Sequence, residues 1–136
     1  NTVPDPHVWG NARNVVRMSE AIRDALIELA PQAKDRFIQN ADRLIADLNR
    51  LDTWIRHQIQ TIPAQNRRLV TTHDAFQYFA QGYGIAIAGT LIGISTEEQP
   101  SAQTVQKLVQ TIRAANVPAI FAETTINPAL IQTVAQ

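Results

Sequence analysis

The chain has 136 residues, of which 45% are hydrophobic and 18% are charged, a composition typical of one globular domain with a buried core. Twelve basic residues balance twelve acidic ones without any Lys/Arg cluster, so nucleic acid and anionic membrane surfaces are not expected as main partners. The absence of cysteine excludes disulfides and thiolate metal sites.

The two ends of the chain indicate a longer protein. The sequence starts at Asn1 rather than at Met, and residues 126–136 have the pattern of a helix that has just begun. No apolar run approaches the roughly 20 residues that a membrane-spanning helix requires. No signal peptide is visible either, and we expect both ends of the sequence to be cuts.

The first forty residues are predicted to contain a loop, one complete helix and the start of a second. Pro4 and Pro6 disfavour helical geometry in the residues before them, which predicts a loop over residues 1–10. A helix is expected over 11–29, with apolar residues at helical spacing. Pro31 marks its end and suits the first turn of the next helix.

A single long helix is the strongest pattern in the sequence, over residues 31–62. Its apolar residues recur every three or four positions for about seven turns, and they are Phe37, Ala41, Leu44, Leu48, Leu51, Ile55, Ile59 and Ile62. Pro63 ends it. Because this helix is much longer than average, we expect it to span more than one structural unit, with its apolar stripe buried.

The remainder of the chain alternates between short apolar runs and helical segments. Strands are expected at 68–72, 85–92 and 118–122, and helices at 74–81 and 101–115. This alternation predicts βαβ units with a buried parallel sheet, so the fold class is α/β.

Two polar residues directly follow predicted strands. His73 comes after the strand at 68–72, and Glu123 after the strand at 118–122. The carboxyl ends of parallel strands meet at one edge of a sheet, where such folds bind their ligands. The alternative is that His73 caps the next helix while Glu123 is solvated.

The other two histidines lie in different settings. His7 stands in a proline-stiffened loop, and Asp5 is close enough to accept a hydrogen bond from its ring, as carboxylates do for metal-binding imidazoles. An ordinary turn histidine is the alternative. His57 is expected to be a partly exposed helix residue, because its neighbours one turn away are poor metal ligands.

Enzyme motifs are absent. The chain has no Gly-x-Ser-x-Gly elbow, no P-loop and no His-Glu-x-x-His, and Gly82-Tyr83-Gly84 is read as a turn. A metallohydrolase using His7, His73 and Glu123 is the enzymatic alternative.

Four stretches, taken in order, point to a known family. They are Asp5-Pro6-His7-Val8-Trp9, Thr71-Thr72-His73-Asp74-Ala75-Phe76-Gln77-Tyr78-Phe79, Gly93-Ile94-Ser95-Thr96-Glu97-Glu98-Gln99-Pro100-Ser101 and Ile120-Phe121-Ala122-Glu123-Thr124. In order and spacing they resemble the periplasmic zinc- and manganese-binding proteins of ABC-type metal importers. The resemblance extends over the whole chain.

The resemblance implies two α/β lobes joined by one rigid helix, with a metal ion held between them. Residues 1–30 would then be the remnant of the first lobe, 31–62 the connecting helix and 63–136 most of the second lobe. His7 and His73 would be metal ligands, one from each lobe. Glu123 occupies a family position beside the site, and Asp5 would orient His7. The remaining ligands would lie outside residues 1–136.

The implied function is capture of a divalent metal outside the cytoplasm, in the periplasm or at the outer face of the membrane, and its delivery to an ABC importer without catalysis. Two imidazoles favour zinc, whereas an added carboxylate would suit manganese better. A surface adhesin is a further alternative. We also expect this chain to associate with a second copy, because the helix at 11–29 would have lost part of its cover.

Overall fold

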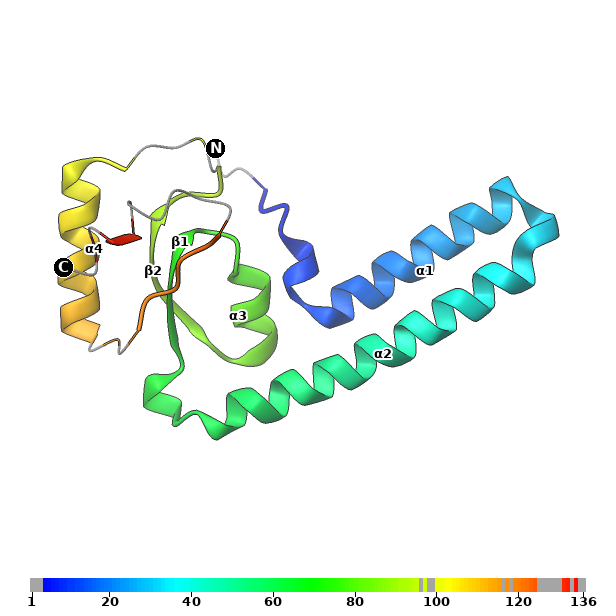
Figure 1. Ribbon diagram of the computed structural model, residues 1–136, viewed down its shortest axis with the longest axis horizontal. Helices are drawn as coiled ribbons and strands as arrows, with labels where there is room; N and C mark the ends of the chain where they lie inside the picture. The colour runs from blue at the N-terminus through cyan, green and yellow to red at the C-terminus, as the bar shows by residue number, and fades with distance from the viewer. Residues whose placement is uncertain are drawn as a thin grey trace.

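The computed structural model describes residues 4–95, 97, 100–115, 117, 119–124, 131, 132 and 134. Two long antiparallel helices, α1 (Ala12–Leu29) and α2 (Lys34–Thr61), form a hairpin that extends away from a small α/β lobe (Figure 1). The chain is thus the α/β fold that the sequence predicts.

The hairpin begins and ends where local chemistry requires. The side chain of Asn11 accepts a 2.9 Å hydrogen bond from the Arg13 N–H and so caps α1. Pro31 opens a 3-10 turn, Pro31–Ala33, that leads into α2. Helix α2 then runs without interruption for 28 residues and ends before Pro63. The long helix predicted at 31–62 is therefore present, with its first three residues in the tighter turn.

The apolar stripe of α2 is less buried than predicted. Phe37, Leu48 and Ile55 are half-buried, but Leu44 and Leu51 are 48% and 44% exposed. The expectation that all of them would be buried is wrong for these two leucines. Within the described part of the chain, α2 packs mainly against α1, and one helix covers only part of such a stripe.

Two parallel strands form the centre of the lobe. Strand β1 (Arg68–His73) pairs with β2 (Ala86–Ile92), and α3 (Gln77–Tyr83) lies in the connection between them. Helix α4 (Ala102–Ala115) packs on β2, on the side away from α3 (Figure 1). These elements match the predicted strands and helices to within a few residues at their ends.

The third predicted strand, at 118–122, is shorter than expected. Phe121 forms a single parallel bridge with Thr71, and its N–H donates to the Val70 carbonyl at 2.9 Å. No longer ladder extends over residues 119–124, and residue 118 lies outside the described part of the chain. Phe121 is 54% exposed, so burial of its side chain does little to stabilise a longer strand here. The bridge nevertheless sets the position of Glu123 two residues later.

The core of the lobe lies between the strands and α4. Among the described residues, its buried members are Val70, Leu91, Ile92, Leu108 and Val134. A Cβ atom on Gly89 would lie 2.5 Å from Leu108 Cδ1, so α4 sits close against β2. This packing fixes β1, which ends at His73. None of the helices in the described residues is long and apolar enough to cross a membrane.

Candidate metal site

His73 is the last residue of β1 and is 8% exposed. Glu123 holds it from the neighbouring segment: its Oε1 accepts a 3.1 Å hydrogen bond from the His73 backbone N–H, and its Oε2 lies 2.6 Å from the ring Nδ1. The second contact has an ion-pair distance but is not aligned as a hydrogen bond. Glu123 is therefore not a solvated residue.

The alternative role of His73 as a helix cap is wrong. Helix α3 begins after Phe76, and no side chain caps its first turn. His73 and Glu123 thus lie together at the carboxyl end of β1, as predicted from their positions directly after two parallel strands.

His7 has the same arrangement in a different element. His7 precedes the 3-10 turn Val8–Gly10. The Oδ1 atom of Asp5 accepts a hydrogen bond from the His7 backbone N–H at 2.9 Å and lies at hydrogen-bond distance, 2.7 Å, from the His7 ring Nδ1. The side chains of His7 and Asp5 are only 12% and 17% exposed. The Asp5–His7 pairing predicted from spacing is present.

The two imidazoles lie side by side although 65 residues separate them in the sequence. Their ring centroids are 5.3 Å apart at an interplanar angle of 73°, and the Trp9 ring lies 5.5 Å from that of His7. A carboxylate beside Nδ1 favours the proton on that nitrogen, which leaves the Nε2 lone pair for a ligand. In this arrangement Nε2, rather than Nδ1, is the nitrogen through which each ring could bind a cation.

No group of three or more His, Cys, Asp or Glu side chains among the described residues is arranged to hold a metal ion. Zinc sites in proteins use three or four protein ligands. Three polar side-chain atoms in the described residues are buried without a hydrogen-bond partner, and two of them, Asp5 Oδ2 and His73 Nδ1, belong to the residues of this site. Such atoms are costly to bury.

His57 is not part of this site. It is exposed on α2, where it lines a shallow surface depression with Trp54 and other polar residues of the same helix. This position agrees with the sequence-based expectation for His57.

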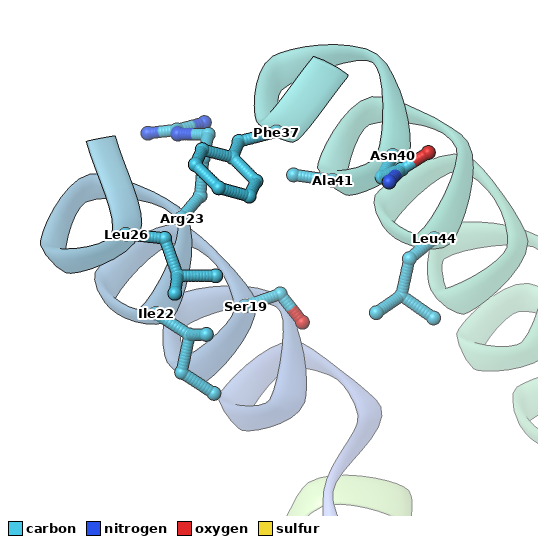
Figure 2. Close-up of a pocket in the computed structure, with 8 residues that line it drawn as sticks. All are labelled: Ser19, Ile22, Arg23, Leu26, Phe37, Asn40, Ala41 and Leu44. Atoms are coloured by element: carbon cyan, nitrogen blue, oxygen red, sulfur yellow. The ribbon is translucent and has the colours of Figure 1, made fainter. Parts of the chain in front are cut away.

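An apolar groove of the hairpin is also separate from the histidines. It lies between the distal halves of α1 and α2 and has a volume of about 320 Å³ (Figure 2). Ile22 and Leu26 line it from α1, and Phe37 and Leu44 from α2. It carries no imidazole or carboxylate, so it offers nothing to a metal ion.

A polar cluster around the buried Asp52 was not predicted from the sequence. It joins Asp52 and Arg56 of α2 to Arg13 of α1 and Tyr83 of α3. The hydrogen bond from Arg56, followed by its positive charge, holds the pKa of Asp52 below its usual value, while burial raises the pKa of Tyr83. The spacing of Asp52 and Arg56, four residues apart in a helix, was the available signal.

Residues 2–136 match the family described as the periplasmic zinc-uptake complex component A. The chain belongs to this family.

Two curated relatives illustrate the range of the family. The chain is 38% identical to the zinc-binding protein TroA of Treponema pallidum over 122 residues, which are 90% of this chain and 39% of that protein. It is 33% identical to the manganese-binding lipoprotein MntA of Halalkalibacterium halodurans over 130 residues, which are 96% of this chain and 43% of the relative. The chain thus spans about two fifths of the length of these relatives.

Solved structures agree on the fold. Periplasmic zinc-binding TroA from Treponema pallidum superimposes with a TM-score of 0.88 at 36% identity, over 96% of this chain and 48% of that one. Fe(III)-bound YtgA from Chlamydia trachomatis superimposes with a TM-score of 0.93 at 32% identity, over 99% of this chain and 51% of that one.

Proposed function

We propose that this chain is part of an extracytoplasmic solute-binding protein that captures a divalent transition metal and passes it to an ABC importer. The observation that carries the proposal is the His7–His73 pair, with ring centroids 5.3 Å apart and with Asp5 and Glu123 on the two Nδ1 atoms. Relatives named as manganese-binding, zinc-binding and iron-binding proteins support it.

The position of the two histidines in the fold gives the metal a mechanical role. His7 precedes the α1–α2 hairpin, whereas His73 ends a strand of the lobe beyond it. A metal ion bound by both would connect these two parts of the molecule, so binding would favour the conformation in which they are close. Asp5 and Glu123 would hold the rings in the orientation that this requires.

We propose zinc as the cargo, with manganese as the alternative. Imidazole nitrogen is a good ligand for zinc, and the carboxylates of Asp5 and Glu123 each contact the Nδ1 atom of one of the two histidines. Manganese would need additional oxygen ligands from outside this chain.

Two other functions are less well supported. In a metallohydrolase Glu123 would activate a water, but here both of its oxygens contact His73. An adhesin role is raised by the laminin-binding adhesin Lmb of Streptococcus agalactiae, whose structure superimposes with a TM-score of 0.89 at 27% identity. The exposed apolar residues of the hairpin, remote from the histidines, are the surface that such a role would use.

We place the protein in the periplasm or at the outer face of the cell membrane. The family description is periplasmic, and several relatives are named as lipoproteins. Its partners would be the metal ion and the membrane subunit of the importer.

The test is metal content. The protein encoded by the complete gene should be purified without chelator and analysed by inductively coupled plasma mass spectrometry. We expect about one zinc per molecule, with loss of the metal in a His7→Ala/His73→Ala double variant and no loss in the matched His57→Ala control. Full metal occupancy in the double variant would contradict the proposal.

A further inference from the structure

Asp52 is buried where the surrounding helix is mostly exposed. It is 6% exposed, and it is the one Asp, Glu, Lys or Arg that is buried in the described ranges. Arg56 donates to both of its oxygens, at 2.9 and 3.2 Å, and Arg13 of α1 donates to Oδ2 at 3.2 Å. Since a buried carboxylate is costly unless it is paired, this anion is held by two cations from two helices.

Arg56 extends these contacts to α3. Its Nη1 donates to the Gly82 carbonyl at 3.0 Å, and its guanidinium lies 5.2 Å from the centre of the Tyr83 ring. The Tyr83 hydroxyl in turn accepts a 3.1 Å hydrogen bond from the Ala12 N–H, one of the donors that the first turn of a helix leaves unpaired. One cluster therefore fastens α2, α3 and the first turn of α1 together.

The contact between α3 and the segment that leads into α1 is also closely packed. A Cβ atom on Gly82 would lie 2.5 Å from the Asn11 side-chain nitrogen, and one on Gly10 would lie 3.4 Å from the Phe79 backbone nitrogen. The segment between His7 and α1 thus lies directly on α3. It is also folded internally, because the Gly10 N–H donates to the His7 carbonyl at 3.1 Å.

Each side of this contact is close in sequence to one of the two histidines. Ala12 is connected to His7 through the short turn Val8–Gly10, and α3 follows His73 after only three residues. From these contacts we infer that Asp52, Arg56 and Tyr83 are positioning residues that set the distance between His7 and His73. The inference rests on the proposed function, because it gives these residues a role in metal affinity although none of them lies at the imidazoles.

The variant that tests the role is Tyr83→Phe, which removes only the hydroxyl that holds Ala12. We expect its zinc affinity, measured by competition titration in the protein encoded by the complete gene, to fall by about fivefold, because a loosened His7 segment is in the binding position for less of the time. Tyr78→Phe is the matched control, since it removes a hydroxyl from the same helix that makes none of these contacts. It should bind zinc like the unmodified protein.

A His7→Ala background separates positioning from a general structural effect. Once His7 is absent, its position no longer matters, so Tyr83→Phe should cause no further loss of zinc affinity in that background. An equal loss in both backgrounds, or no loss in either, would overturn the inference. If His7→Ala alone leaves the zinc affinity unchanged, the proposed metal site is refuted, and the positioning role is refuted with it. Should Tyr83→Phe fail to fold, Arg56→Lys provides the same comparison, because it keeps the charge but loses the contact with Gly82.

Discussion

Replacing Glu123 with Gln should weaken metal binding while leaving the fold intact. Glu123 presents one oxygen to the His73 backbone N–H and the other to Nδ1. Glutamine keeps the oxygen for the backbone N–H but places an NH₂ donor against Nδ1. His73 must then carry its proton on Nε2, the nitrogen that would bind the metal.

The expected size of the effect follows from the role of this carboxylate. Loss of a residue that orients a metal-binding histidine costs about 10- to 100-fold in affinity, which corresponds to about 1.4–2.7 kcal/mol. Isothermal titration with Zn²⁺ measures the change, and the melting temperature of the metal-free protein should move little. Glu28→Gln, an exposed substitution on α1, is the control for loss of one charge. Zinc affinity within twofold of the unmodified protein for Glu123→Gln would refute the tautomer argument.

The remaining predictions concern the core, the buried ion pair, the apolar hairpin and the third histidine. Leu91 is 1% exposed in the core of the lobe, so Leu91→Ala should lower the free energy of unfolding by about 2–5 kcal/mol in urea titrations, and a loss below 1 kcal/mol would contradict the packing described. Arg56 lowers the pKa of Asp52, so the ionised carboxylate contributes its full stabilisation above the unfolded pKa of about 3.9, and this contribution is lost as pH falls through the lower folded pKa. In urea titrations from pH 5 to 2, the unmodified protein should therefore lose stability more steeply than Asp52→Asn. Parallel curves for the two proteins would contradict this. The 136-residue chain expressed alone should self-associate in sedimentation velocity through its exposed hairpin leucines, and Leu44→Glu should reduce this; a monomer at all concentrations would show the reasoning to be wrong. In zinc titrations, His73→Ala should lose most of the zinc affinity and His57→Ala should lose none. The reverse result would contradict the assignment of His73 as a metal ligand.

Much of the fold was predictable because its signals are local. The 3.6-residue spacing of apolar residues in α2, the prolines at its two ends and the β-branched runs of the strands all act within a few residues of one another. The position of Glu123 beside His73 was also predictable, because parallel strands bring their carboxyl ends to one edge.

Features that depend on tertiary contacts were not predictable in the same way. The exposure of Leu44 and Leu51 depends on what packs against α2, and the periodicity of one helix does not contain that information. Similarly, the Tyr83–Ala12 hydrogen bond joins residues 71 positions apart. Over residues 119–124 the third predicted strand forms a single bridge, at Phe121, and most of these side chains are exposed, which the apolar sequence of the run did not indicate.

X-ray absorption spectroscopy of the zinc-loaded protein tests the central claim most directly, because it counts the imidazoles on the metal. The account predicts that the metal is bound by both His7 and His73, at nitrogen distances of about 2.0–2.1 Å. His7→Ala and His73→Ala should each remove one imidazole from the zinc shell, while His57→Ala should leave the spectrum unchanged. A zinc shell that keeps all of its imidazoles in either the His7→Ala or the His73→Ala variant would contradict the claim that these two residues bind one metal ion.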